Sequence, residues 1–186
     1  MAITPEDAKA VASRSECLFT EAQVQAALDK MASKITTQIE NKNPLVICVM
    51  NGGLIVSAEL LKRLNFPLEV DYLHASRYGD ALIGDSLTWH AEPKKSLANR
   101  TILIVDDILD VGRTLQEIVH YCENAGAEKV YTAVLTEKEH DRKAGDLEAD
   151  FTALRVPDRY IYGYGMDYKQ YLRNSAGIYA AAKIDE

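Results

Sequence analysis

Two adjacent aspartates, Asp106 and Asp107, are followed by a third acid, Asp110, and by the run Val-Gly-Arg-Thr at 111–114. The apolar run before them is typical of a buried strand, and helical apolar spacing begins after them. Backbone N–H groups at the start of such a helix point outwards at the positive end of its dipole and bind anions. Two acids beside a phosphate site would repel phosphate, but their oxygens accept hydrogen bonds from sugar hydroxyls. The segment therefore predicts a clamp for a ribose 5-phosphate.

A plainer interpretation of this segment is an acidic turn in which Asp110 or Thr114 merely caps a helix. Neither of the common nucleotide-binding loops supplies a third interpretation. The sequence lacks both the GxxxxGK[ST] pattern of a P-loop and the GxGxxG pattern of a dinucleotide fold at this place. On spacing alone, the clamp and the cap both stay open.

The elements that would position these residues alternate along the chain. Continuous apolar runs at 44–50, 101–105 and 129–135 predict buried strands, and residues 68–75 alternate like a further strand. Helical spacing follows Thr20, spans 54–64 and returns at 111–125, while residues 76–100 predict a long loop or an exposed ribbon. This order predicts an α/β fold with an open, mainly parallel twisted sheet flanked by helices. Ligands of such sheets bind beyond the carboxyl ends of the strands.

The bulk properties exclude several classes of protein. A chain of 186 residues fits one domain, and a formal net charge of −7 argues against binding to nucleic acid or to an anionic membrane. No apolar stretch approaches the roughly 18 residues that span a bilayer, and the first residues do not resemble a signal peptide. Three cysteines without metal-ligand spacing predict reduced, buried thiols. We therefore expect a cytoplasmic protein.

Four segments carry a resemblance to a known family. Val105-Asp-Asp-Ile-Leu-Asp-Val-Gly-Arg-Thr-Leu115 closely resembles the phosphoribosyl pyrophosphate motif of type I phosphoribosyltransferases. The segments 50–53, 76–79 and 156–173 resemble, in the family's order, its pyrophosphate loop, its mobile catalytic loop and its purine and pyrophosphate segment. The similarity runs from about residue 15 to about residue 180. It points to the hypoxanthine-guanine branch of the family.

The resemblance implies a fold and a reaction. The fold is a single phosphoribosyltransferase domain over 1–186, with a core at about 30–140 and a small hood subdomain from the N-terminal segment and about 150–186. The reaction is purine salvage, in which the 5-phosphoribosyl group of phosphoribosyl pyrophosphate passes to N9 of a 6-oxopurine base. Hypoxanthine and/or guanine would give IMP or GMP and pyrophosphate. Mg²⁺ is the implied cofactor, and the implied assembly is a homodimer or a homotetramer.

The resemblance also implies roles on the phosphoribosyl side. Asp106 and Asp107 would hold the ribose hydroxyls, and Asp110 would be the general base near the imidazole ring of the purine. The residues implied to bind the 5-phosphate are Asp110, Val111, Gly112, Arg113 and Thr114. Those implied to bind pyrophosphate are Asn51, Gly52, Gly53 and Arg173, with a cis peptide bond between Met50 and Asn51. Asp167 is the implied metal contact.

Base recognition falls, by the same resemblance, on four residues: Lys138, Tyr160, Ile161 and Asp167. Ser76, Arg77 and Tyr78 would form a lid that excludes water. The chain departs from the family pattern at Asn51, where many relatives have lysine, and at Arg77, where many have serine. The four histidines form no catalytic cluster in the sequence, and only His140 lies close to Lys138.

Two alternatives to a hypoxanthine-guanine enzyme stay open. A lysine is a hydrogen-bond donor only, so Lys138 favours a 6-oxo group over the 6-amino group of adenine but does not rank hypoxanthine, guanine and xanthine. The first alternative is therefore a xanthine-preferring phosphoribosyltransferase. The second is a nucleotide-sensing regulator on the same fold. An RNA-binding regulator needs a basic face, which a net charge of −7 disfavours.

Overall fold

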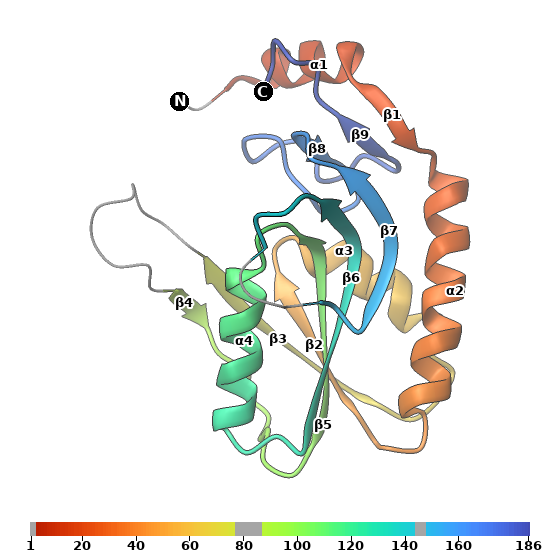
Figure 1. Cartoon of the computed structure of the whole chain (residues 1–186), viewed down its shortest axis with the longest axis vertical. Coiled ribbons are helices and arrows are strands. Elements are labelled where there is room, and N and C mark those ends of the chain that lie inside the picture. The colour runs from red at the N-terminus through yellow and green to blue at the C-terminus, as the bar shows by residue number, and fades with distance from the viewer. Residues whose placement is uncertain (1–2, 77–86, 144–147) are drawn as a thin grey trace.

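The main sheet of the protein has six strands. The computed structural model describes residues 3–76, 87–143 and 148–186. Along the sheet the order is β4-β3-β2-β5-β6-β7, and all neighbours are parallel except β3 and β4. The strands are β2 (Leu45–Met50), β3 (Glu69–Ser76), β4 (Thr88–Ala91), β5 (Thr101–Leu109), β6 (Lys129–Glu139) and β7 (Phe151–Pro157). The predicted mainly parallel α/β sheet is confirmed (Figure 1).

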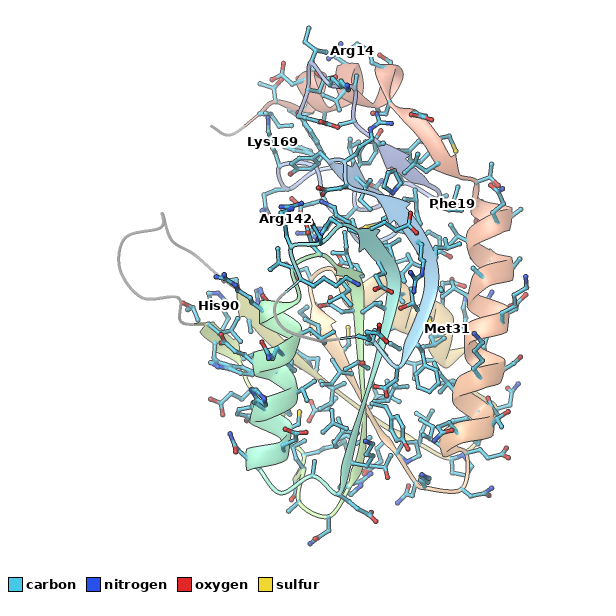
Figure 2. All side chains as sticks on the ribbon, viewed as in Figure 1. Arg14, Phe19, Met31, His90, Arg142 and Lys169 are labelled. Carbon is cyan, nitrogen blue, oxygen red and sulfur yellow. The ribbon has the colours of Figure 1, made fainter. Side chains whose placement is uncertain are left out.

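Helices cover both faces of this sheet. The helices α2 (Glu21–Ile39) and α3 (Gly53–Leu61) pack on one face, and α4 (Arg113–Asn124) packs on the other (Figure 1). Thr20 and Gln23 form the capping box that starts α2. Met31, labelled in Figure 2, is 2% exposed in the core on the α2 side. The two apolar layers hold the central strands β2, β5 and β6 in fixed positions.

A second, three-stranded sheet lies near the carboxyl ends of the parallel strands (Figure 1). Its order is β1 (Glu16–Phe19), β9 (Ile178–Ala180) and β8 (Ile161–Tyr162), with α1 (Pro5–Arg14) above it. We call these four elements the hood. The buried ring of Tyr162 stacks on Tyr179, with 5.5 Å between ring centroids. The hood thus joins the two ends of the chain and overhangs the edge where ligands of parallel sheets bind.

Four local expectations require correction. β5 continues to Leu109, because it pairs with β6 as far as Leu109 and Glu137, so the two aspartates lie inside the strand rather than after it. α4 begins at Arg113 rather than at 111, because Gly112 has a left-handed φ of 89°. β7 extends the main sheet past residue 140 and takes residues 151–157 out of the hood. Cys17 is exposed, whereas the other two cysteines are buried.

Two further expectations concern the ribbon and the membrane. Within 76–100, β4 pairs antiparallel with the end of β3, so this part of the segment is a ribbon rather than a loop. Residues 77–86 lie outside the described residues. Across the three described ranges, none of the helices is both long and apolar enough to cross a bilayer.

Candidate active site

A cleft of about 890 Å³ opens at the carboxyl ends of the central strands. Three parts of the chain contribute most of its wall: the end of β2 with the turn after it, the end of β3, and the end of β5 with the start of α4. Gln170 and Arg173, which follow the hood strand β8, also line it. His90 and Arg142, both labelled in Figure 2, also line it. The predicted site residues that line the cleft are Asn51, Gly52, Ser76, Asp106, Asp107, Asp110, Val111, Gly112, Arg113, Thr114 and Arg173.

The two aspartates of β5 are fixed by the sheet itself. The backbone N–H of Asp107 donates to Oδ1 of Asp106 at 2.9 Å, and the Thr136 hydroxyl on β6 donates to the Asp107 carbonyl at 3.1 Å. Burial, together with repulsion from Asp107, raises the pKa of Asp106 well above its usual range. Burial also raises the pKa of Asp107, against an opposing effect of Arg173. Among the described residues, no salt bridge reaches either carboxylate.

Glycines allow the backbone to approach these acids. A Cβ on Gly52 would lie 2.1 Å from Oδ2 of Asp107, and a Cβ on Gly165 would lie 2.0 Å from the Gly52 carbonyl oxygen. Gly165 has a left-handed φ of 111°, which disfavours any other residue there. The peptide bond between Met50 and Asn51 is cis, as predicted. The turn after β2 therefore closes directly over Asp107.

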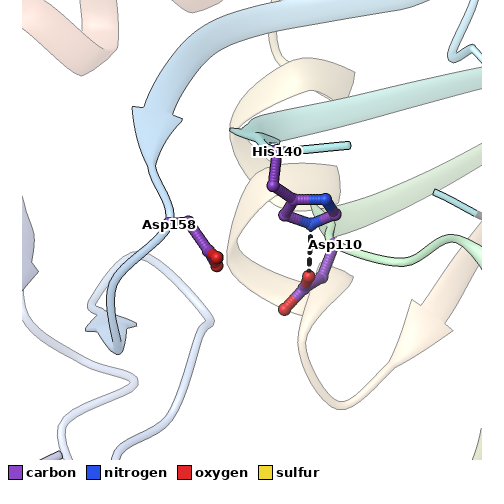
Figure 3. Close-up of side chains that lie close together, drawn as sticks. All are labelled: Asp110, His140 and Asp158. Carbon is purple, nitrogen blue, oxygen red and sulfur yellow. Dashed lines mark hydrogen bonds and ion pairs between the residues drawn. The ribbon is translucent and has the colours of Figure 1, made fainter. Parts of the chain in front are cut away.

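Asp110 lies at the centre of a network of polar side chains, of which Figure 3 draws Asp110, His140 and Asp158. Its Oδ2 accepts from Nζ of Lys138 at 2.9 Å, and its Oδ1 accepts from Nε2 of His140 at 2.7 Å. Nζ of Lys138 is also 3.8 Å from Asp158, which pairs with Arg142 at 2.6 Å. Partial burial alone would raise the pKa of Asp110, but the hydrogen bonds from Lys138 and His140 bring that pKa below its usual value.

The same network contains a potential cation site. One ligand atom each from Asp110, His140 and Asp158 can be found within 4.8 Å of the others. The two carboxylates already pair with the ammonium of Lys138 and the guanidinium of Arg142. A divalent ion in this cluster would have to displace both of these cations. We therefore assign no metal to it.

The C-terminal side of the cleft is held by a second pair. Nη2 of Arg173 lies 2.7 Å from Oδ1 of Asp167, and Nη1 donates to the Gly165 carbonyl at 2.7 Å. The other oxygen of Asp167 accepts from the backbone N–H of Gln170, also at 2.7 Å. Arg173 therefore lies between the glycine turn and Asp167, and its charge acts on Asp107.

Several predicted residues lie beside the cleft rather than in its wall. The described wall does not include Gly53, Lys138, Tyr160, Ile161 or Asp167. Lys138 is on β6, and its side chain is 13% exposed. The Tyr160 ring packs edge-on against Tyr168 with 5.1 Å between centroids, and the Ile161 side chain is buried. Arg77 and Tyr78 lie outside the described residues.

The structure also shows contacts of three histidines to which the sequence assigns no role. His140 contacts Asp110, and His74 and His90 line the cleft with their ring centroids 4.7 Å apart. The Ser76 hydroxyl lies 2.7 Å from Nε2 of His90. Only the closeness of His140 to Lys138 in the sequence could have indicated one of these contacts. The pairing of His74 with His90 depends on the register of β3 against β4.

A comparison with protein families decides the affiliation of the chain. The model of the phosphoribosyl transferase domain matches residues 17–169. The chain belongs to the phosphoribosyltransferase family. The matched range contains the acids of β5, the Asp110 network and Asp167, and Arg173 follows just after it.

Individual members of the phosphoribosyltransferase family cover most of the chain. A hypoxanthine-guanine-xanthine phosphoribosyltransferase of Tritrichomonas foetus is 32% identical over 84% of this chain and 86% of its own length. A hypoxanthine-guanine phosphoribosyltransferase of Bacillus subtilis (strain 168) is 32% identical over 84% and 87%. Among solved structures, a hypoxanthine phosphoribosyltransferase from Staphylococcus aureus has a TM-score of 0.85 at 25% identity, covering 90% of this chain and 91% of that one. The predicted family and type I fold are confirmed.

Proposed function

We propose that this protein transfers the 5-phosphoribosyl group of phosphoribosyl pyrophosphate to N9 of hypoxanthine or guanine. The observation that carries the proposal is the 2.9 Å contact between Asp110 and Lys138, beside the two aspartates of β5. The contact places a general base and a hydrogen-bond donor for the purine close to the acceptors for the ribose hydroxyls. The printed names of the two curated relatives support the same substrates.

The chain supplies each part of this reaction from a fixed place. Asp106 and Asp107 accept hydrogen bonds from the ribose hydroxyls, and the turn 110–114 with the start of α4 takes the 5-phosphate. Asn51, Gly52 and Arg173 bind pyrophosphate, with Gly53 behind them against the Val105 carbonyl. Asp110 accepts the proton that leaves the imidazole ring of the base.

Lys138 completes the base site by donating to the 6-oxo group of the purine. Tyr160 offers a ring face for stacking, and the backbone of Ile161 and Asp167 borders the 2-position. Ser76 lies on the opposite side of the cleft, where with Arg77 and Tyr78 it would begin the lid. This arrangement excludes adenine because a donor-only lysine cannot accept from a 6-amino group.

Mg²⁺ fits the carboxylates in and beside the cleft. Oxygen donors are its preferred ligands, and Asp106 and Asp107 supply carboxylate oxygens in the wall of the cleft. Asp167 would hold the ion together with substrate oxygens once Arg173, whose Nη2 lies 2.7 Å from Oδ1 of Asp167, turns to the pyrophosphate. When bound, the ion stabilises negative charge on the departing pyrophosphate.

The proposal extends to assembly and location. An apolar groove beside the turn after β2 is bordered by Leu54, Val70 and Tyr72, whose exposed fractions are 51%, 45% and 45%. Exposed apolar surface of this kind supports a homodimer or homotetramer. The free cysteines support a reducing compartment, and we place the enzyme in the cytoplasm. Light scattering on the purified protein measures the assembly directly.

The reaction is tested by mixing the protein with phosphoribosyl pyrophosphate, Mg²⁺ and one base at a time. Hypoxanthine, guanine, xanthine and adenine are compared, and nucleotide formation is followed by its absorbance. We expect product with hypoxanthine or guanine and none with adenine. A marked preference for xanthine would replace the proposal with the xanthine-preferring alternative. No product with any base, despite tight nucleotide binding, would favour the nucleotide-sensing regulator.

A further inference from the structure

His140 is the one buried histidine side chain in contact with the proposed general base. Its side chain is 4% exposed, whereas the Asp110 side chain is 40% exposed. Nε2 of the ring lies 2.7 Å from Oδ1 of Asp110 (Figure 3). None of the roles proposed above uses this contact.

The other ring nitrogen determines where the proton of His140 lies. The backbone N–H of Arg142 donates to Nδ1 at 3.1 Å, so Nδ1 carries no proton in this arrangement. The proton of the neutral ring is therefore on Nε2, which donates to Asp110. Because the ring is buried and held at both nitrogens, its donor direction is fixed.

Asp110 thus accepts from two donors of different kinds, on two different oxygens. Lys138 binds Oδ2 through a long side chain that also lies 3.8 Å from Asp158. His140 binds Oδ1 through a short, buried ring. Of these two donors, only the lysine has a second carboxylate in reach and a flexible side chain with which to leave Asp110.

We propose that His140 is a positioning residue that holds Asp110 by Oδ1 while Lys138 leaves Oδ2 for the 6-oxo group of the purine. This inference rests on the proposed function. In the empty site each oxygen of Asp110 already accepts one hydrogen bond, which makes the carboxylate a weaker acceptor for a proton from the purine. When Lys138 turns to the substrate, Oδ2 becomes the free acceptor, and the bond from His140 keeps it aimed at the imidazole ring.

Substitutions at His140 separate positioning from mere packing. In His140→Phe the ring volume stays but the donor is lost, and misdirected Oδ2 should lower kcat by about 10- to 100-fold. In His140→Gln the side-chain amide reaches the place of Nε2, and we expect kcat within about threefold of the wild type. In His140→Asn the amide reaches only the place of Nδ1, so the loss should match that of His140→Phe. The KM for phosphoribosyl pyrophosphate should change less than about twofold in all three.

His120→Phe is the matched control, because His120 is exposed on α4 and lies outside the described wall of the cleft. It should leave kcat unchanged. If His140→Phe does not fold, the contrast between His140→Gln and His140→Asn tests the same point. Normal kcat in His140→Asn, or equal losses in His140→Gln and His140→Asn, overturns the proposal.

A spectroscopic measurement tests the geometry without relying on turnover. In protein labelled with ¹⁵N-histidine, the ring of His140, assigned by its absence in His140→Asn, should show a protonated Nε2 and a bare Nδ1. A protonated Nδ1 would overturn the inference even in an active enzyme. An inactive wild type with the expected ring signals would instead remove the proposed function and leave the His140 contact in place.

Discussion

The half of the cleft built by β5 and the half built around the end of β6 are both rich in charge, but they hold that charge differently. Asp106 and Asp107 stand side by side within a strand, and among the described residues neither is in a salt bridge. Around β6, by contrast, Asp110 pairs with Lys138 and Asp158 pairs with Arg142. We call the half at β5, whose acids have no salt-bridge partner among the described residues, the unpaired half, and the half around β6 the paired half.

This difference separates two ways of preparing a site for a ligand. The acids of β5 are held by the strand ladder and need no rearrangement, so their repulsion lowers the stability of the empty protein and is relieved when hydroxyls or a cation arrive. The residues around β6 are stable without a ligand and must exchange partners when a purine binds. We expect ribose binding to be rapid and insensitive to neighbouring residues, and base binding to depend on the ion pairs.

The largest expected effect tests the paired half of the cleft, around β6. Asp110→Asn keeps the shape of the side chain but removes a carboxylate that can accept a proton. We expect kcat to fall by about 100-fold or more, with little change in the KM for phosphoribosyl pyrophosphate. Steady-state rates at saturating concentrations of both substrates measure this. Turnover near that of the wild type would reduce Asp110 to a group that positions Lys138.

A smaller effect is expected at Lys138, because it binds substrate without taking part in proton transfer. Lys138→Ala removes a charge-assisted hydrogen bond, which is worth about 1.5–3 kcal/mol, or about 10- to 100-fold in the KM for hypoxanthine. The KM for phosphoribosyl pyrophosphate should change by less than about twofold. Lys129→Ala, at the exposed amino end of the same strand, is the matched control. Equal losses for both substrates would contradict a role in reading the base.

The sequence was most informative where structure follows from local pattern. The apolar runs at 44–50 and 129–135, the helical spacing and the capping box of Thr20 gave the parallel sheet and its helices correctly. The predicted ends of β5 and β6 were wrong, because the length of a strand depends on its pairing with neighbouring strands and not only on apolar content. Asp106 is polar and still lies in β5, opposite Val134.

The site residues that lie in contiguous motifs could be predicted, whereas contacts between distant parts of the sequence could not. The acids, the turn 110–114 and Gly52 come from contiguous motifs, and the structure brings them to one cleft. His140 was not assigned a role, because its contact with Asp110 joins residues 30 positions apart through the register of β5 against β6. Gly165 was missed for the same reason, since its approach to Gly52 depends on how the hood folds over the sheet.

The smallest expected effect tests the unpaired half of the cleft, at β5, through the stability of the folded protein. The pKa of Asp106 is raised by burial and by Asp107, so the folded protein binds the proton more tightly than an unfolded chain whose aspartates titrate near 3.8. The resulting contribution to stability is complete below that value and is lost as the pH rises through the raised pKa. Asp106→Asn removes the charge while its amide oxygen can still accept from Asp107. It should therefore stabilise the empty protein at pH 8 by about 1 kcal/mol, which raises Tm by about 2–4 °C.

The pH dependence of this gain distinguishes charge from packing. Thermal melts of the wild type and of Asp106→Asn should differ at pH 8 and converge near pH 4, because the wild-type carboxyl is then protonated. The same variant should bind phosphoribosyl pyrophosphate more weakly, since it offers one acceptor fewer to the ribose hydroxyls. A variant that is less stable than the wild type at both pH values would mean that Asp106 is compensated in the empty protein. The contrast between the two halves of the cleft would then be lost, and both would have to exchange partners on binding.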